Sequence, residues 1–328
     1  MTSTKPLSII CLPLEAELET RIETVSHIER IPWSASKDEL INALREAEGL
    51  LVGNRLPIGD EVFSAAPKLR VLAGYGVGYD AFDIPAATKR GIFVTNTPDV
   101  LTETVADLVL GLLFAMSRHI MQNAEYVRSG GWSRRENLPP LGFDVRGRTL
   151  GVVGFGRIGR VVTARAKVLG MRTLFNDVFD DVPDGAPASE YRALPDLLAE
   201  SDVVTLHTDL NPTSRHLIST DELACMRPHA VLINTSRGPV VDQPALARAL
   251  HAGRLAGCAL DVLEREPPAP DDPILEAPNT ILVPHIGTST EETRYAMREL
   301  AVRNLVAGLC GERPPTCLNP EVLERGTR

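Results

Sequence analysis

The stretch from Thr149 to Asp177, TLGVVGFGRIGRVVTARAKVLGMRTLFND, decides the fold. Its first five residues are apolar or β-branched, which indicates a buried strand. A glycine-rich turn follows, and residues 160–169 then place apolar side chains at helical spacing. Residues 171–176 form a second apolar run, which ends at the acid Asp177. Strand, turn, helix and strand in this order indicate one βαβ unit of a parallel sheet.

Each part of this unit suits a bound dinucleotide. Gly154 permits the tight turn, Gly156 lets the backbone approach a pyrophosphate, and Gly159 allows the helix to pack close to the strand. The N-terminus of the helix offers free N–H groups to the phosphate charge. Asp177 can accept hydrogen bonds from the ribose hydroxyls and would repel a 2′-phosphate. Glycine spacing alone is a weak signal, but all the parts in order predict a dinucleotide site, with NAD favoured over NADP.

Composition limits the classes of function. At 328 residues the chain is long enough for two domains, and its net charge of −9 argues against a nucleic-acid partner. The five cysteines form no CxxC pair, so they predict neither a disulfide framework nor a metal site, and they fit a reducing compartment. The longest apolar helical run, residues 108–116, is far too short to span a bilayer. We therefore expect a soluble, cytoplasmic protein without a membrane or nucleic-acid partner.

Strand-like and helix-like segments alternate along the chain, which is typical of parallel sheets covered by helices. Residues 102–119 form the strongest predicted helix, and residues 120–148 are expected to be irregular. The tail beyond residue 314 is expected to return to the first domain. Strands are predicted at residues 7–12, 49–52, 69–73, 92–95, 149–153, 171–176, 202–207, 230–234, 257–261 and 280–283. Helices are predicted at residues 37–47, 61–65, 102–119, 160–169, 219–226, 244–252 and 291–309, and within 189–200.

These elements predict an α/β protein with two domains. Residues 99–287 would form a doubly wound parallel Rossmann sheet that binds NAD. Residues 1–98 and 288–328 would form a smaller, flavodoxin-like α/β domain that binds the substrate.

Three polar side chains follow predicted strands of the larger sheet, where functional groups of such sheets gather. Arg237 could form a forked pair with a carboxylate and polarise the adjacent carbonyl. His285 could deliver a proton to that carbonyl oxygen as hydride arrives on carbon. Glu266 could bond the other imidazole nitrogen and keep the ring protonated. Together they suggest hydride transfer to a 2-keto acid.

Other residues could support this chemistry. Asp261 could bond the nicotinamide carboxamide, and the backbone N–H groups of Gly76, Val77 and Gly78 could form a nest for the substrate carboxylate. His207, also at a strand end, is expected to line the cofactor groove. Taken singly, a strand-end histidine is more often structural, a lone arginine is usually a surface cation, and Glu266 beside two prolines could simply face solvent. The remaining histidines are predicted to be structural and without partners: His27, His119, His216, His229 and His251.

Six motifs occur along the chain in one order. They are GVGYDAFD at residues 76–83, TPDVLTETVAD at 97–107, LGVVGFGRIGR at 150–160, INTSRGPVVD at 233–242, ALDVLEREPP at 259–268 and VPHIGTSTEETR at 283–294. Through them the sequence resembles the D-isomer-specific 2-hydroxyacid dehydrogenase family over nearly its whole length.

The resemblance implies an NAD-dependent oxidoreductase in which Arg237, Glu266 and His285 are catalytic and His285 is the acid/base. It implies that the backbone at Val77 and Gly78 contacts the substrate carboxylate, with Tyr75 near the substrate side chain. It also implies a homodimer with the region 102–119 at the subunit interface. The cofactor set predicted in this way is Thr104, Gly154, Gly156, Arg157, Ile158, Gly159, Asp177, His207, Thr235, Asp261, His285 and Gly287.

Within the family, the LTETVAD and GVGYD segments are most similar to glyoxylate and hydroxypyruvate reductases, which form D-2-hydroxy acids. A phosphoglycerate dehydrogenase-like enzyme is the alternative inside the family. Some relatives are dinucleotide-sensing corepressors, so a binding module on the same fold is the alternative from another class. The substrate side chain stays open, because Tyr75 and residues 132–135 lie where family members vary.

Overall fold

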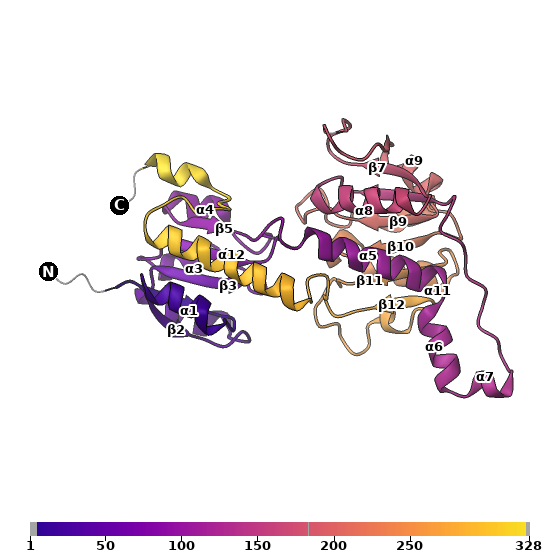
Figure 1. Cartoon of the computed structure of the whole chain (residues 1–328), viewed down its shortest axis with the longest axis horizontal. Coiled ribbons are helices and arrows are strands. Elements are labelled where there is room, and N and C mark those ends of the chain that lie inside the picture. The colour runs from indigo at the N-terminus through magenta and orange to yellow at the C-terminus, as the bar shows by residue number, and fades with distance from the viewer. Residues whose placement is uncertain (1–4, 183, 326–328) are drawn as a thin grey trace. The chain divides into compact units, whose positions relative to one another are not determined.

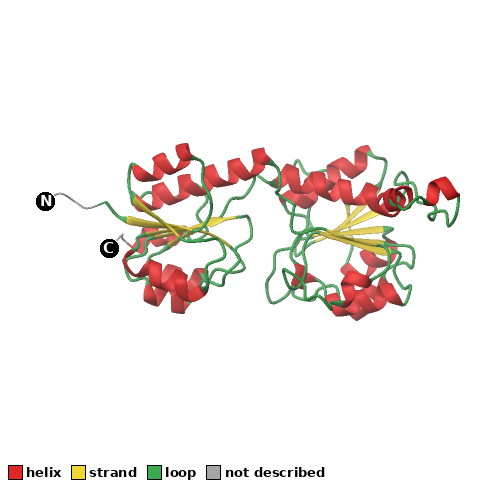
Figure 2. Cartoon of the chain, turned by 90° about the horizontal axis from the view of Figure 1, so that it is seen from below, coloured by secondary structure: helices red, strands yellow, loops and turns green. Residues whose placement is uncertain are grey.

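The computed structural model describes residues 5–182 and 184–325 of the chain (Figure 1). The chain divides into two compact units, Met1–Leu101 with Ser289–Arg328, and Thr102–Thr288. Each unit is a sheet with helices on both faces (Figure 2). The two units are described separately.

The first unit contains a five-stranded parallel sheet in the order β2-β1-β3-β4-β5. This is the strand order of flavodoxin-like doubly wound sheets, so the predicted class of the smaller domain is confirmed. The edge strand β2 was missed, because its sequence HIER carries charged side chains and buries none of its residues. The strands are β1 (Leu7–Ile10), β2 (His27–Arg30), β3 (Gly49–Gly53), β4 (Val71–Tyr75) and β5 (Phe93–Thr95).

Local sequence explains where the helices of this unit begin and how they pack. Ser36 and Glu39 form a capping box at the start of α2, in which Ser36 N–H donates to Glu39 Oε2 at 2.7 Å. In α12, a Cβ added at Gly308 would lie 2.6 Å from Val71 Cβ, so this glycine lets the helix lie against β4. The helices are α1 (Ala16–Glu23), α2 (Lys37–Ala43), α3 (Asp60–Ala65), α4 (Ile84–Lys89) and α12 (Glu291–Leu309), with 3-10 turns η1 (Leu44–Glu46) and η4 (Pro320–Arg325).

The C-terminal tail returns to the first unit, as predicted. Buried Asn319 accepts a hydrogen bond from Val94 N–H and donates to the carbonyl of Ile92, each at 2.8 Å. An isolated antiparallel bridge pairs Cys317 with Thr95. The tail therefore covers the free edge of β5.

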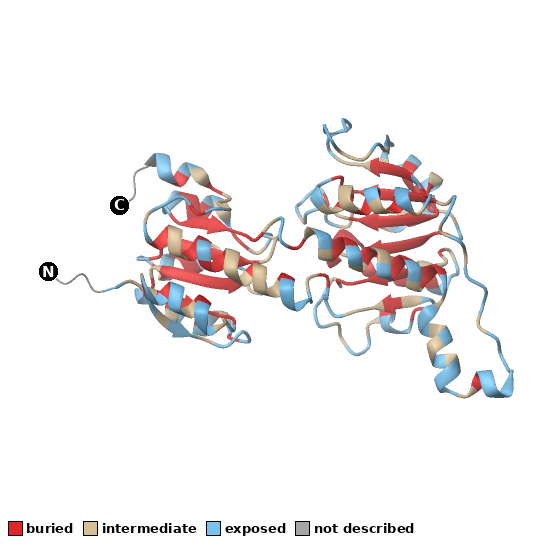
Figure 3. Ribbon diagram, viewed as in Figure 1, coloured by how far each residue is buried: buried red, intermediate tan, exposed pale blue. Residues whose placement is uncertain are grey.

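The second unit is a seven-stranded parallel sheet in the order β12-β11-β10-β9-β6-β7-β8. The strand order reverses between β6 and β9, which confirms the predicted doubly wound Rossmann sheet. Its central strands are buried along their whole length (Figure 3). The strands are β6 (Thr149–Val153), β7 (Arg172–Asn176), β8 (Glu190–Tyr191), β9 (Val203–Leu206), β10 (Val231–Asn234), β11 (Gly257–Leu260) and β12 (Thr280–Leu282).

Helices cover both faces of this sheet, and α5 packs against it by burying Val105, Ala106, Val109, Leu112 and Leu113. In the described ranges no single helix is long and apolar enough to cross a membrane, although α5 and α6, bent by 60°, meet that test as a pair. The helices are α5 (Thr102–Ser117), α6 (Ile120–Arg128), α7 (Gly131–Arg134), α8 (Arg157–Val168), α9 (Leu194–Glu200), α10 (Thr220–Cys225) and α11 (Gln243–His251), with 3-10 turns η2 (Gly238–Val240) and η3 (Pro273–Glu276).

Residues 120–148 were expected to be irregular, and this expectation is wrong for their first half. The segment contains α6 and α7, which extend from the end of α5 (Figure 1). No residue of α6 is buried. Its apolar residues Ile120, Met121, Ala124 and Val127 nevertheless recur at helical spacing, so the sequence does carry a helix signal here, in a helix that packs on no core of this chain.

Candidate active site

The glycine turn after β6 has the geometry that a pyrophosphate needs. Gly154 has φ +91°, a conformation that L side chains rarely adopt. A Cβ at Gly156 would meet nothing within 4 Å, so open space lies beside the backbone where α8 begins. A Cβ at Gly159 would lie 2.2 Å from the carbonyl oxygen of Gly154, so this position packs helix against strand. The N-terminus of α8, which starts at Arg157, thus opens onto the space beside Gly156.

Two buried hydroxyls that follow strands of this sheet have no hydrogen-bond partner in the part of the chain that the structure describes. They are Oγ1 of Thr235, directly after β10, and Oγ1 of Thr208, which follows β9. The backbone N of Thr208 lies 2.9 Å from where a Cβ of Gly154 would be. Buried hydroxyls are normally satisfied, so both orphans fit a site that receives a polar ligand. Thr208 was missed from the sequence, because a strand-end threonine carries no signal until its burial is known.

Asp177 directly follows β7, and its side chain is bonded to the glycine turn. Its Oδ2 accepts a hydrogen bond from Phe155 N–H at 2.5 Å, and its Oδ1 accepts one from Val178 N–H at 2.7 Å. The carboxylate therefore has a fixed orientation beside the turn. Each of its oxygens keeps lone-pair capacity for a ribose hydroxyl.

The turn that carries Arg237 is held by a residue that sequence reasoning missed. Buried Asn234, at the end of β10, donates to the carbonyl of Arg237 at 2.9 Å. Its Oδ1 accepts hydrogen bonds from both N–H and Oγ–H of Ser236, at 3.0 and 2.8 Å. The guanidinium of Arg237 donates to the Ser236 carbonyl through Nη1 at 2.8 Å. One amide thus shapes the whole loop from 234 to 237.

His285 and Glu266 are in direct contact. The distance from His285 Nδ1 to Glu266 Oε2 is 2.9 Å, and both side chains are roughly half-exposed. Burial acts to raise the pKa of Glu266, but the hydrogen bond and charge of His285, the N–H of Leu263 and the charge of Arg237 lower that pKa overall. Because a carboxylate only accepts, Nδ1 carries the hydrogen and Nε2 is left for proton exchange.

Asp261 holds the backbone of the segment that follows His285. It is buried, and its two oxygens accept hydrogen bonds from Ile286 N–H at 2.6 Å and Gly287 N–H at 2.8 Å. A Cβ at Gly287 would lie 3.0 Å from Asp261 Oδ2, so a glycine suits this close approach. Burial raises the pKa of Asp261, against the lowering effect of the two backbone bonds. Both of these hydrogen-bond donors to Asp261 are thus backbone groups. A hydrogen bond from a nicotinamide carboxamide would use the remaining lone pairs of the Asp261 carboxylate.

His207 follows β9, and its ring is neutral. Burial lowers the pKa of His207 to about 3, although the residue as a whole is partly exposed. Its Nε2 lies 3.0 Å from Thr205 Oγ1. A neutral imidazole next to the glycine turn is suited to line the cofactor groove, and it is not suited to act as a general acid.

In the first unit, the loop after β4 presents two backbone donors. Gly76 has φ +142°, and its N–H and carbonyl both bond Thr97, at 3.1 and 2.8 Å. Asn96 Nδ2 donates to the carbonyl of Val77 at 2.8 Å. Within the described ranges no partner takes the N–H of Val77 or of Gly78. Tyr75, at the end of β4, is buried and carries Arg294 over its ring.

The structure places most of the predicted residues of the second unit after strand ends of one parallel sheet. One or two of them follow each of six strands: Gly154 after β6, Asp177 after β7, His207 after β9, Thr235 and Arg237 after β10, Asp261 and Glu266 after β11, and His285 after β12. The others lie on helices, with Arg157, Ile158 and Gly159 at the start of α8 and Thr104 in the first turn of α5. The prediction that the other histidines lack partners is wrong for three of them. His216 Nε2 lies 2.7 Å from Glu264, His229 Nε2 lies 2.8 Å from Asp202, and His251 Nε2 lies 3.4 Å from the carbonyl oxygen of Pro273.

Comparisons with known proteins agree with this geometry. Residues 110–287 match the model of the D-isomer specific 2-hydroxyacid dehydrogenase, NAD binding domain. A glyoxylate reductase of Korarchaeum cryptofilum is 47% identical over 91% of this chain and 92% of its own. The crystal structure of a glyoxylate reductase from Paecilomyes thermophila has a TM-score of 0.87 at 30% identity, covering 96% and 98% of the two chains.

A third similar protein is an NADPH-dependent glyoxylate/hydroxypyruvate reductase from Sinorhizobium meliloti, whose structure is a complex with NADP and malonate. It is 32% identical, with a TM-score of 0.85 and coverage of 97% and 98%. The chain belongs to the D-isomer specific 2-hydroxyacid dehydrogenase family and is an oxidoreductase that acts on 2-hydroxy acids with a nicotinamide dinucleotide.

Proposed function

We propose that the chain reduces a small 2-keto acid of the glyoxylate or hydroxypyruvate type to the D-2-hydroxy acid, with NADH as the reductant. The observation that carries the proposal is the 2.9 Å contact between His285 and Glu266, with Arg237 near enough to lower the pKa of the same glutamate. The names of the relatives support the substrate class. A phosphoglycerate dehydrogenase-like enzyme stays the alternative within the family.

Each of the three side chains has a distinct part in the proposed reaction. Arg237 binds the substrate carboxylate as a forked cation and polarises the neighbouring carbonyl. His285 gives the proton on Nε2 to the carbonyl oxygen, and Glu266 stabilises the protonated ring through Nδ1. A bound nicotinamide would supply the hydride. The N–H groups of Val77 and Gly78 are proposed as further donors to the carboxylate, with Tyr75 near the substrate side chain.

The cofactor is proposed to bind along the edge that holds the glycine turn. Gly154, Gly156 and Gly159 with the start of α8 would receive the pyrophosphate, and Thr104, Arg157 and Ile158 would line it. Asp177 would bond the ribose, and Thr235, Asp261, His207 and Gly287 would contact the nicotinamide end. To these we add Thr208, on the evidence of its orphan hydroxyl.

NAD is proposed over NADP because the residues that follow β7 are acidic. Asp177 is fixed by two backbone bonds, and Asp180, Asp181 and Asp184 follow within seven residues. A 2′-phosphate at this position would meet several like charges. The similar structure from Sinorhizobium meliloti is a complex with NADP, so the fold itself does not decide between NAD and NADP. The proposal of NAD therefore rests on these acids. A homodimer and a cytoplasmic location stay predictions.

The test is a matrix of initial rates. NADH and NADPH are each supplied with glyoxylate, hydroxypyruvate, pyruvate and phenylpyruvate, and 3-phosphoglycerate is assayed in reverse. We expect turnover of glyoxylate or hydroxypyruvate with NADH. A preference for 3-phosphoglycerate would select the alternative enzyme, a preference for NADPH would contradict the role of Asp177, and tight NADH binding without any turnover would favour a dinucleotide-sensing module.

Variants separate the catalytic roles. We expect His285→Ala to lower kcat by about 10²–10⁴-fold with NADH binding retained, and Arg237→Ala to raise KM as well as lower kcat. Glu266→Gln should lower kcat with NADH binding retained, because the charged hydrogen bond that holds the His285 ring through Nδ1 becomes a neutral one. Glu264→Gln, in the same loop but bonded to His216, is the matched control and should keep the parent kcat. Parent turnover in His285→Ala would overturn the assignment.

A further inference from the structure

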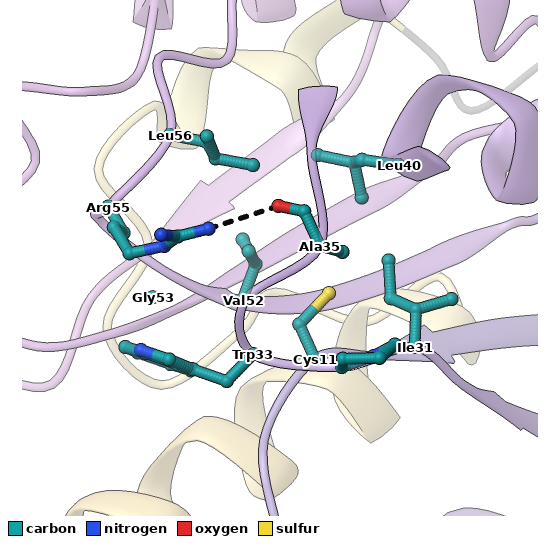
Figure 4. A pocket seen from close by; sticks show the side chains of 10 residues that line it. Cys11, Ile31, Trp33, Ala35, Leu40, Val52, Gly53, Arg55 and Leu56 are labelled. Carbon is teal, nitrogen blue, oxygen red and sulfur yellow. Dashed lines mark hydrogen bonds between the residues drawn. The ribbon is translucent and has the colours of Figure 1, made fainter. Parts of the chain in front are cut away.

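A pocket in the first unit is too small for a substrate or a cofactor (Figure 4). It has room for about one water molecule, and its walls include Cys11, Trp33, Val52 and Arg55. Nη2 of Arg55 donates to the carbonyl of Ala35 at 3.0 Å, so the guanidinium is itself part of the wall. We therefore place no ligand there.

In the second unit, Glu266 lies on a loop whose middle is not held by the core. Residues 265–267 are exposed, whereas Val262 before them and Ile274 after them are buried. A functional side chain keeps one geometry only when packing or hydrogen bonds around it restrict its movement. Since packing does not restrict these residues, the 2.9 Å contact between Glu266 and His285 depends on the hydrogen bonds that fix the loop.

Gln243, the first residue of α11, bonds this loop near both of its ends. Its Oε1 accepts a hydrogen bond from Glu264 N–H at 2.9 Å, and its Nε2 donates to Asp272 Oδ2 at 2.7 Å. Only 5% of Gln243 is exposed, so water competes little for either bond. An amide suits this position because one partner is a donor and the other is a carboxylate, which only accepts.

The backbone at Leu263 and Glu264 also contacts both catalytic loops. The N–H of Leu263 donates to Oε1 of Glu266 at 3.1 Å. A Cβ added at Gly238 would lie 1.9 Å from the carbonyl oxygen of Leu263, so the residue after Arg237 packs directly on this peptide. The loop of Glu266 and the loop of Arg237 therefore meet at this backbone.

We propose that Gln243 is a positioning residue, which holds the loop so that Glu266 keeps its contact with His285. It acts through the backbone of Glu264 and the carboxylate of Asp272, and not on the substrate. This inference rests on the proposed reaction, in which Glu266 stabilises the protonated ring of His285. Displacing a catalytic group by about 1 Å can cost about 10²-fold in rate, so a looser loop should be measurable in kcat.

The experiment begins with Gln243→Met, which keeps the length of the side chain and removes both hydrogen bonds. We expect kcat with glyoxylate or hydroxypyruvate, whichever the chain reduces, to fall by about tenfold with the Kd of NADH unchanged. In a Glu266→Ala background the same substitution should change kcat by less than about twofold, because no carboxylate is left to position. Arg248→Met, at an exposed position of the same helix, is the control and should keep the parent kcat. An equal loss in both backgrounds would indicate a merely structural role and would overturn the proposal.

An exchange of polarity tests the bond to Asp272. Gln243→Glu would place a second carboxylate beside Asp272 and should lower kcat, because like charges repel at this distance. Adding Asp272→Asn supplies an amide donor to the new carboxylate, and its remaining oxygen can still accept from Ile274 N–H. The double variant should therefore recover to within about threefold of the parent kcat. No recovery would contradict the role of this bond.

Hydrogen exchange measures the same restraint without turnover. The Glu264 amide should exchange at least about tenfold faster in Gln243→Met than in the parent, because its acceptor is lost, and the double variant should restore the parent rate. A parent rate of exchange in Gln243→Met would overturn the proposal. A parent kcat in Glu266→Ala would instead contradict the proposed reaction, so the two failures are distinguishable.

Discussion

Gly156 and Gly159 stand three residues apart in the same turn, yet an added methyl group would have opposite effects at the two positions. At Gly156 it would enter open space, with φ −71°, so the fold should tolerate it. That open space is where a pyrophosphate would lie, so Gly156→Ala should weaken NADH binding by at least about tenfold with an unchanged midpoint of urea unfolding. At Gly159 the methyl would lie 2.2 Å from a backbone oxygen, so Gly159→Ala should destabilise the protein by about 1–3 kcal/mol.

Calorimetric titration with NADH and urea unfolding measure the two effects separately. Gly185→Ala is a control for Gly156, because its added Cβ also meets nothing within 4 Å, although its φ of +75° adds some strain. A Gly156→Ala variant that binds NADH as the parent does would remove the pyrophosphate from this turn.

The position of a site residue was predictable where that residue directly follows a strand. Arg237, Glu266 and His285 could be selected because each comes shortly after a recognisable apolar run, and the contact of His285 with Glu266 is now observed. Asn234 and Thr208 could not be selected in this way. The role of Asn234 lies in three hydrogen bonds to a turn whose shape the sequence does not reveal.

At the scale of elements, Asp202 connects three segments at the amino ends of the strands, whereas the candidate site lies at their carboxyl ends. This buried residue, just before β9, accepts from Thr149 N–H of β6 at 2.8 Å and pairs with Arg227 and His229 before β10. Asp202→Asn would remove the carboxylate charge that pairs with Arg227 and Arg148, so we expect a loss of about 1–2 kcal/mol in the free energy of unfolding at pH 7, since both arginines stay partly in solvent. Asp196→Asn, on the exposed first turn of α9, should change it by less than about 0.5 kcal/mol.

The same contacts give this loss a pH dependence. Burial acts to raise the pKa of Asp202, but the Thr149 N–H, His229, Arg227 and Arg148 lower it overall. A carboxyl with a lowered folded-state pKa stabilises fully above its ordinary range, and the stabilisation is lost as the pH falls through the folded-state pKa. Unfolding midpoints of the parent and of Asp202→Asn should therefore converge in strong acid, and a difference that stays constant down to pH 2 would contradict the ionic origin.

Elements were predictable in proportion to the apolar surface that they bury. The strands β6, β9, β10 and β11 have only buried residues, and all appear in the sequence as apolar runs. The edge strand β2 and the helix α6 bury no residue and were not predicted. The short helices α1 and α4 were not predicted either, although α1 buries Leu18 and Ile22 and α4 buries Ala86 and Ala87. One or two buried side chains in a short segment are thus too weak a pattern to indicate a helix.

On the scale of the whole molecule, α6 and α7 expose apolar side chains that no other part of the described chain covers. Ile120, Met121 and Val127 of α6 are about half exposed, and Trp132 of α7 is 68% exposed. Contiguous apolar side chains on this scale mark an interaction surface, and helices that bury nothing in their own chain need a partner to be stable. A second copy of the chain is the partner that the family resemblance implies, with α5 beside it.

We therefore expect a mass near twice 35.6 kDa in analytical ultracentrifugation. Placing charges on this surface with Met121→Glu and Val127→Glu together should shift the protein toward the monomer by at least about tenfold in dissociation constant, because each charge would be buried without a counter-charge. Leu275→Glu, at an exposed apolar residue of η3, is the matched control and should leave the mass unchanged. If the parent sediments as a monomer at micromolar concentration, the exposure of α6 must have another cause; if the double variant stays dimeric, the interface lies on a different face.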